Sequence, residues 1–216
     1  MVATANVAVD AVILCVIENW PGAKVLKIGC ASRDSRLDGY CLETLCKAIP
    51  NWADLEEETQ KAYIDAFIKD ADIVFSTCAS CLKMDVKAYK FSQVIIEEAA
   101  LQAEEERLSA ILKGCSMLIM FGDHQQLRAS SNKCAKQFNF NISYFEIMIT
   151  SAQRHASEIG SSISVTLLMQ YRMQSTIADI VSKISYDGVL KTGVTDDDRR
   201  PPLGFPWPQK NVGVSL

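Results

Sequence analysis

The chain has 216 residues, of which 49% are hydrophobic and 22% are charged, and its formal net charge is −4. This length is enough for one large domain or for one domain and the start of another, and the apolar content excludes an intrinsically disordered chain. The slightly negative charge excludes nucleic-acid binding through overall charge alone, so such binding would have to rest on a local groove.

Turn residues and apolar periodicity predict helices that alternate with short strands. The first helix is expected to be capped by Asn6, to begin at Val7 and to end before Pro21, with an apolar face formed by Ala8, Ala11, Val12 and Cys15. Further helices are predicted over Asp54–Lys69, Gln102–Leu112, Tyr144–Ala156 and Thr176–Ile184. Strands are predicted over Lys24–Ile28, Ala71–Thr77, Gln93–Ile96, Met117–Phe121 and Ile163–Leu168, while residues 33–50 are expected to be irregular. Strands that alternate with helices predict an α/β fold with a parallel sheet flanked by helices and right-handed crossovers.

The composition changes after residue 195. Residues 196–200 are all charged, and the proline-rich stretch 201–208 cannot continue a helix or a central strand. We expect a linker here, followed by the start of another strand at residues 212–216.

Eight cysteines are present, most of them inside apolar runs, and we interpret them as reduced, buried thiols. Cys78 and Cys81 have the spacing of a redox pair or half a zinc site, but no second pair at ligand spacing follows them. The sequence has no secretion signal and no apolar run long enough to span a bilayer, so we expect an intracellular protein of the cytoplasm or nucleus.

Three apolar runs end abruptly in polar residues, as buried parallel strands do when they deliver chemistry to the carboxyl edge of a sheet. The runs lie within 94–100, 118–127 and 168–173. Glu97 and Glu98 follow the first. In a phosphoryl-transfer site one such carboxylate holds the magnesium shell, and the other orients or deprotonates the attacking water. The alternative is a helix amino terminus that carries glutamates without any function.

Polar groups suited to phosphate follow the other two runs. Gly122 permits a sharp exit from a strand, and the amide of Gln126 can sense a terminal phosphate; the alternative is an ordinary turn in which Asp123 caps backbone N–H groups. The planar fork of Arg172 matches phosphate oxygens, although it could instead pair with a surface carboxylate. We expect Tyr171 to pack rather than to take part in chemistry.

Taken in order, these segments resemble the first RecA-like lobe of superfamily 1B helicases, in the branch that includes the nonsense-mediated-decay helicase and senataxin. The resemblance rests on ordered segments that match the family's motifs Ia, II, III and IV and the strands between them: Thr4–Asp10, Val25–Gly29, Ala71–Cys78, Val94–Ala100, Phe121–Leu127, Gln170–Met173 and Tyr186–Leu190.

The resemblance implies a RecA-like P-loop NTPase fold that is truncated at its N-terminus, with a partial helicase lobe over residues 1–195 and an interlobe linker and first strand over 196–216. It implies that Glu98 positions the hydrolytic water, and that Gln126 and Arg172 approach the γ-phosphate. Glu97 would hold Mg²⁺ through water, and Asp123 and Gln170 would be further nucleotide-binding candidates. Thr4 and Asn6 would lie near a bound single strand of RNA or DNA, and the implied cofactors are ATP and Mg²⁺.

The chain departs from the family in two respects. Motif II normally reads Asp-Glu, and the longer side chain of Glu97 is expected to weaken binding of Mg²⁺, which demands near-ideal octahedral geometry. No Gly-x-x-x-x-Gly-Lys-Ser/Thr loop is present, so we expect the isolated chain to lack useful ATP affinity and helicase activity.

Several identities remain open at this point: a fragment of a longer helicase, a degenerate paralogue, or a non-catalytic scaffold. A dinucleotide-binding enzyme would need a Gly-x-Gly-x-x-Gly turn, which is absent.

Overall fold

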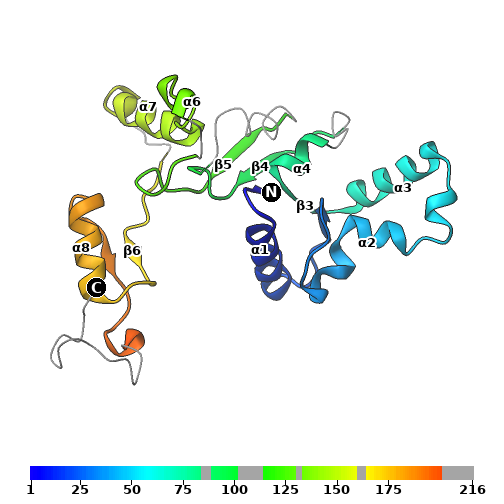
Figure 1. The fold of residues 1–216 in the computed structure, drawn as a ribbon, viewed down its shortest axis with the longest axis horizontal. Helices are drawn as coiled ribbons and strands as arrows, with labels where there is room; N and C mark the ends of the chain where they lie inside the picture. Colours follow the sequence, from blue (N-terminus) through cyan, green and yellow to red (C-terminus); the bar gives the residue numbers. More distant parts are fainter. Residues whose placement is uncertain (84–88, 102–113, 130–132, 160–163, 201–216) are drawn as a thin grey trace. The chain divides into compact units, whose positions relative to one another are not determined.

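The structure, a computed structural model, describes residues 1–83, 89–101, 114–129, 133–159 and 164–200. The chain divides into two compact units, Met1–Thr150 and Ser151–Leu216, and each is described by itself (Figure 1). The two units are distinguished only by compactness, so they do not test the domain boundary expected after residue 195. That boundary stays a prediction. The helix predicted over Gln102–Leu112 and the segments predicted over 201–216 lie outside the described residues.

The first unit is built on a five-stranded sheet in the order β2-β3-β1-β4-β5. Its strands are β1 (Val2–Ala3), β2 (Val25–Ile28), β3 (Ile73–Thr77), β4 (Gln93–Ile96) and β5 (Met117–Met120). Every neighbouring pair is parallel, which confirms the predicted α/β fold. The strands β1 and β2 are buried throughout, as apolar strands of a parallel sheet covered on both faces are. The strand β5 is only half-buried, and Met117 at its start is 50% exposed.

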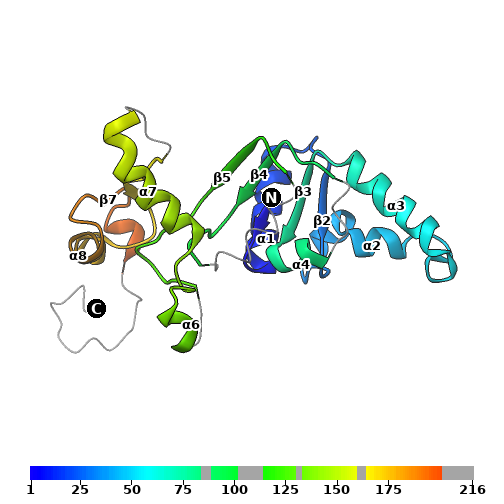
Figure 2. The ribbon, with the colours of Figure 1, turned by 90° about the horizontal axis from the view of Figure 1, so that it is seen from above.

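Helices connect the strands of this unit or follow them in the chain. They are α1 (Asn6–Asn19), α2 (Leu42–Lys47), α3 (Glu57–Asp70), α4 (Cys78–Lys83), α6 (Lys133–Gln137) and α7 (Tyr144–Ile159), together with the 3₁₀ helices η1 (Ser35–Tyr40) and η2 (Trp52–Asp54). The α7 helix continues into the second unit. Figure 2 shows α2 and α3 at the β2 end of the sheet and β5 at the opposite end. The helix α1 packs against β1 and β3.

Three local predictions for the first unit are wrong. Asn6 is the first helical residue rather than the cap, because Ala5 takes the extended cap conformation and no side chain caps the helix. The residues that α1 buries are Val9 and Ile13, whereas Ala11 and Cys15 of the predicted apolar face are exposed. The helix is apolar almost all round, so its sequence pattern could not fix which face lies inward. Residues 33–50, expected to be irregular, contain η1 and α2.

A buried ion pair ties α1 to the sheet. The Lys27 side chain is 1% exposed, and its Nζ donates to Oδ1 of Asp10 on α1 at 2.6 Å. The other carboxylate oxygen of Asp10 accepts from the Ser32 hydroxyl at 2.7 Å. A buried cation requires such a partner, since an unpaired charge would carry a large desolvation cost.

The second unit contains a two-stranded parallel sheet of β6 (Met169–Gln170) and β7 (Lys191–Thr192), with the helix α8 (Ser175–Ser185) and the 3₁₀ helix η4 (Asp197–Arg199). The predicted strand Ile163–Leu168 is wrong over its described part. Residues 164–168 have no regular structure, and Val165 and Leu167 are 88% and 80% exposed. A β-branched apolar run becomes a strand only where a neighbour pairs with it, and no strand in the described ranges pairs with 164–167.

None of the helices in the described part of the chain has the length and apolar character needed to cross a bilayer.

Candidate functional site

The predicted site residues of the first unit follow strands that end at one edge of the sheet. Val2 of β1 pairs with Ile96 of β4, and the N–H of Glu97 donates to the carbonyl oxygen of Val2 at 2.9 Å. Ile96 in turn pairs with Met120 of β5. Because all three strands are parallel, Thr4, Glu97 and Asp123 leave the sheet at the same carboxyl edge, which the sequence predicted for Glu97 and Asp123.

The two carboxylates differ in environment. Glu97 is half-buried, and its burial raises the pKa of its carboxyl group, with a further contribution from the Glu98 charge. Glu98 is exposed and has a φ of 52°, a left-handed conformation that a non-glycine residue seldom adopts. Such conformations persist only where the surroundings hold them, and they cluster at functional sites.

The surroundings that hold Glu98 come from the loop after β5. The N–H of Ala99 donates to the carbonyl oxygen of Phe121 at 2.6 Å, and the N–H of Leu101 donates back to the carbonyl oxygen of Glu98 at 3.0 Å. A Cβ atom at Gly122 would lie 2.8 Å from the backbone nitrogen of Ala100 and 3.1 Å from that of Ala99. Only glycine allows the two loops to approach this closely.

Asp123 organises the rest of the second loop. One of its carboxylate oxygens accepts from the Gln125 N–H at 3.0 Å, and the other accepts from the side-chain amide of Gln126 at 2.8 Å. Asp123 thus caps the turn, as the alternative interpretation expected, and it also orients Gln126, which is exposed. The contact of Gln126 with a phosphate stays a prediction. Two residues after Gln126, Arg128 pairs with Glu146 of α7 at 2.6 Å, so this loop is anchored on that helix.

Thr4 and Asn6 lie where β1 passes into α1. Asn6 and Val7 of the first helical turn are exposed, Val7 by 80%. No side chain caps this turn and it holds no acidic residue, so its N–H groups favour an anion. A nucleic-acid backbone is one such anion, and the predicted role of Thr4 and Asn6 stays a prediction.

The third predicted segment lies in the second unit, where Gln170 ends β6 and Arg172 follows. The side-chain carbonyl oxygen of Gln170 accepts from the N–H groups of Arg172 and Met173 at 2.8 and 2.6 Å. Its amide nitrogen donates to the carbonyl oxygen of Met173 at 2.9 Å and to the Thr192 hydroxyl at 2.5 Å. The loop therefore occupies all the hydrogen-bonding positions of this amide. The exposed guanidinium of Arg172 has no hydrogen bond or ion pair with any residue that the structure describes.

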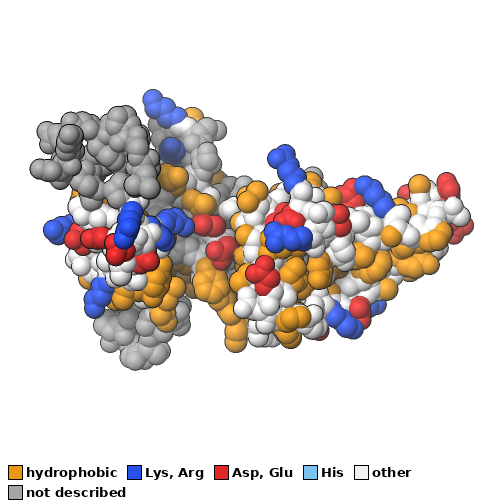
Figure 3. Space-filling model, turned by 90° about the horizontal axis from the view of Figure 1, so that it is seen from below, with side chains coloured by type: hydrophobic (Ala, Val, Ile, Leu, Met, Phe, Trp, Pro, Cys, Tyr) orange, Lys and Arg blue, Asp and Glu red, His pale blue; other side chains and the backbone are white. Residues whose placement is uncertain are grey.

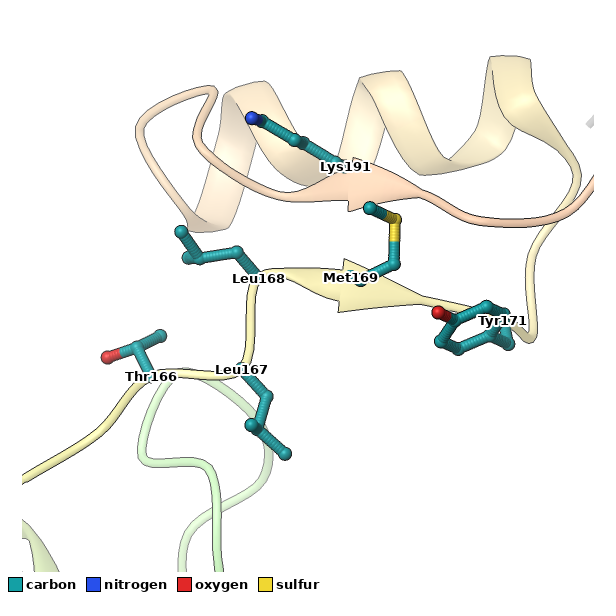
Figure 4. A pocket seen from close by; sticks show the side chains of 6 residues that line it. All are labelled: Thr166, Leu167, Leu168, Met169, Tyr171 and Lys191. Atoms are coloured by element: carbon teal, nitrogen blue, oxygen red, sulfur yellow. The ribbon is translucent and has the colours of Figure 1, made fainter.

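A hollow of about 540 Å³ lies beside this loop (Figure 4). Its lining is mainly apolar and comes from Thr166, Leu167, Leu168, Met169, Tyr171 and Lys191. A triphosphate needs several cations or N–H donors, and Lys191 is the only cation in this lining, so the hollow does not have the chemistry of a triphosphate site.

Figure 3 shows basic and acidic side chains interspersed among the described residues on the face in view. Among the described residues, no three His, Cys, Asp or Glu side chains are grouped so that they could hold a metal ion.

Three structural contributions were not predicted from the sequence. The close approach at Gly122 was signalled only by a glycine directly after an apolar strand. Nothing marked the Lys27–Asp10 pair, and nothing marked Arg199, which donates to the carbonyl oxygens of Arg172 and Tyr171 at 2.9 and 2.7 Å. Such contacts join residues far apart in the sequence, so local patterns cannot reveal them.

Comparison with known proteins places the chain among helicases. A family model described as an AAA domain matches residues 41–131. The "Regulator of nonsense transcripts 1 homolog" of Neurospora crassa is 27% identical over 95% of this chain and 20% of its own length. The "ATP-dependent helicase NAM7" of Saccharomyces cerevisiae is 32% identical over 67% of this chain and 14% of its own length. The "ATP-dependent helicase upf1" of Schizosaccharomyces pombe is 31% identical over 66% of this chain and 15% of its own length.

The chain thus spans a fifth or less of the length of these relatives. Together with the parallel sheet, the matches confirm the predicted RecA-like fold.

Proposed function

Since the chain is a helicase region of the superfamily 1B, nonsense-mediated-decay type, we propose that it forms the nucleotide-facing edge of a lobe that couples ATP hydrolysis to movement on single-stranded RNA or DNA. The observation that supports this most is the joining of the loops after β4 and β5. The hydrogen bond from Ala99 to Phe121 and the close approach of Gly122 bring the carboxylates and the Gln126 loop to one edge.

Each residue then has a distinct task. Glu98 orients the attacking water and accepts its proton, while Gln126 contacts the terminal phosphate through its amide. Arg172 offers a cation to the charge that develops on the transferred phosphoryl group. Thr4 and Asn6 contact the backbone of the single strand next to the first turn of α1.

The residues present fit a water-mediated Mg²⁺ site rather than a closed cage. Mg²⁺ is commonly held by one or two carboxylates and by the substrate phosphates, and Glu97 supplies one half-buried carboxylate. When bound, Mg²⁺ neutralises charge on the β- and γ-phosphates. The raised pKa of Glu97 means that a proton competes with the ion more effectively than at an ordinary glutamate.

A non-catalytic scaffold is the second candidate. Glu97 occupies a position where the helicases carry aspartate, and the 216 residues contain no Gly-x-x-x-x-Gly-Lys-Ser/Thr loop. Both features are compatible with a lobe that keeps its shape and its nucleic-acid contact without turnover.

Both candidate functions include contact with a single strand of nucleic acid. Binding of a fluorescent single-stranded oligonucleotide, followed by anisotropy, tests this contact. We expect weak binding that falls steeply with salt, as phosphate contacts do. Asn6→Asp, which places a carboxylate at the first turn of α1, should weaken it. Asn19→Asp at the other end of the helix is the matched control. Equal effects of the two substitutions would contradict the proposed surface.

A further inference from the structure

The loop that carries Arg172 is held through its backbone from two sides. From within, the Gln170 side chain accepts from the N–H groups of Arg172 and Met173 and donates to the Met173 carbonyl oxygen and to the Thr192 hydroxyl on β7. This one amide therefore fixes both ends of the turn and ties it to the neighbouring strand.

From outside, Arg199 of η4 holds the same turn. Its Nε donates to the carbonyl oxygen of Arg172 at 2.9 Å, and its Nη2 donates to that of Tyr171 at 2.7 Å. Its Nη1 donates to the carbonyl oxygen of Asp198 at 2.9 Å, within η4 itself. A guanidinium fork suits two adjacent carbonyl groups because its donors lie in one plane.

A second contact keeps the segment of Arg199 in place. The Asp196 carboxylate accepts from the Ser175 hydroxyl at 2.6 Å and from the Gln174 amide at 3.2 Å, at the start of α8. The Asp198 carboxylate caps its own turn through the Thr195 N–H and hydroxyl. Arg199 thus approaches the loop from a turn that is itself anchored.

The backbone around Arg172 is therefore fixed, whereas its side chain makes no hydrogen bond or ion pair with the residues that the structure describes. A cation presented in this way is preorganised: less conformational freedom is lost when it meets an anion. Gln170 has no donor left for a phosphate, since both of its amide hydrogens are already used.

We propose that Gln170 and Arg199 are positioning residues that fix the backbone of Arg172 and so aim its guanidinium at a phosphate. This rests on the proposed function of Arg172, and it gives Gln170 a task other than direct contact with the nucleotide. Arg199 acts on the carbonyl groups of the turn, and Gln170 acts mainly on its N–H groups.

Amide hydrogen exchange in the ¹⁵N-labelled chain tests the positioning by itself. Gln170→Ala should remove the exchange protection of the Arg172 and Met173 N–H groups, whereas Gln170→Glu should keep it, because the acceptor oxygen remains. Arg199→Ala should broaden or shift the signals of Tyr171, Arg172 and Met173, and Arg199→Lys should restore them in part. Arg200→Ala is the matched control, since Arg200 pairs only with the Asp197 side chain among the described residues. Unchanged protection in Gln170→Ala, or equal effects of Arg199→Ala and Arg200→Ala, would overturn the proposal.

A titration with inorganic pyrophosphate, followed by calorimetry in every variant, links the positioning to anion binding. We expect Arg199→Ala to weaken this binding about three- to ten-fold and Arg200→Ala to leave it within about two-fold. If Arg172→Ala binds pyrophosphate as tightly as the unmodified chain, the proposed role of Arg172 fails while the exchange result still decides the positioning. Equal weakening by both arginine variants would show that Arg199 contributes only charge and would contradict the inference.

Discussion

The backbone nitrogen of Ala99 lies 2.6 Å from the carbonyl oxygen of Phe121. This hydrogen bond joins the loop after β4, which carries the two glutamates, to the loop after β5, which carries the two glutamines. It lies between a residue held in a left-handed conformation, Glu98, and a glycine that leaves no room for a side chain, Gly122. The position of the predicted water-orienting carboxylate is thus set partly by the loop that carries the predicted phosphate sensor.

Gly122→Ala should destabilise the chain. The new methyl group would overlap the backbone of Ala99 and Ala100, which cannot swing aside as a flexible side chain can. We expect a loss of about 1–3 kcal/mol in the free energy of unfolding, measured by urea denaturation. Gly39→Ala is the control, because a Cβ atom at Gly39 would meet no other atom within 4 Å and the φ of this glycine is not positive. A Gly122→Ala variant as stable as Gly39→Ala would show that the loops are not in close contact.

The Lys27–Asp10 pair should behave as a buried ion pair. Asp10→Ala leaves the Lys27 ammonium 1% exposed without its carboxylate, and we expect a loss of about 3–5 kcal/mol. Lys27→Met should cost less, because Asp10 is 18% exposed and keeps the Ser32 hydroxyl. The double variant should be more stable than Asp10→Ala alone. Additive losses in this double-mutant cycle would mean that the two side chains are not coupled.

The carboxyl group of Glu97 gives a pH prediction. Its burial, and then the Glu98 charge, raise its pKa above the ordinary value. A group with a raised folded pKa stabilises the fold fully below its unfolded pKa, and the contribution is lost as pH rises through the folded pKa. Glu97→Gln should therefore raise Tm near neutral pH, and the gain should disappear as the pH falls to about 4. If the Tm gain of Glu97→Gln over the unmodified chain instead grew as the pH fell, the pKa of Glu97 would be lowered rather than raised.

The Glu98 contribution to that pKa can be separated. Glu98→Gln removes the neighbouring charge, so the Glu97 pKa should fall, but not to its ordinary value, because burial is the larger cause. A ¹³C-carboxyl titration by NMR measures it directly. A Glu97 pKa that does not change in this variant would mean that the two carboxylates do not interact.

Nucleotide binding by the chain alone can be measured by calorimetry. In phosphate-loop enzymes a nest of backbone N–H groups and a lysine supply much of the affinity for a triphosphate, and the 216 residues contain no such loop. We expect no binding of Mg–ATP in the micromolar range. Micromolar affinity would show that other groups of this chain hold the triphosphate.

The helices and strands predicted most accurately from the sequence are those that local patterns determine. The strand Gln93–Ile96 matches β4, and the helix predicted over Tyr144–Ala156 lies within α7. Turn residues and uniform apolar runs mark these elements clearly. The inward face of α1 was wrong because the helix is apolar on most sides, and residues 164–168 failed as a strand because pairing depends on a distant neighbour.

Part of the candidate site could also be predicted from local sequence patterns. That Glu97 and Asp123 leave the sheet at one edge follows from parallel strands and could be inferred from the sequence. The hydrogen bonds of Gln170 with its own loop join residues only 2 or 3 apart, and the one from Arg199 to Arg172 joins residues 27 apart. Both depend on side-chain geometry that no sequence motif encodes. The roles of Glu98, Gln126 and Arg172 in hydrolysis stay predictions.

The most direct measurement of the central claim is ATP hydrolysis by a hybrid helicase. Residues 92–129 of this chain would replace the aligned segment of the Saccharomyces cerevisiae relative, which retains its own remaining sequence. We predict hydrolysis stimulated by single-stranded RNA, a further gain from Glu97→Asp, and loss of hydrolysis but not of ATP binding in Glu98→Gln. A hybrid that binds ATP and RNA but hydrolyses no ATP with either Glu or Asp at position 97, or one whose turnover survives Glu98→Gln, would contradict the account.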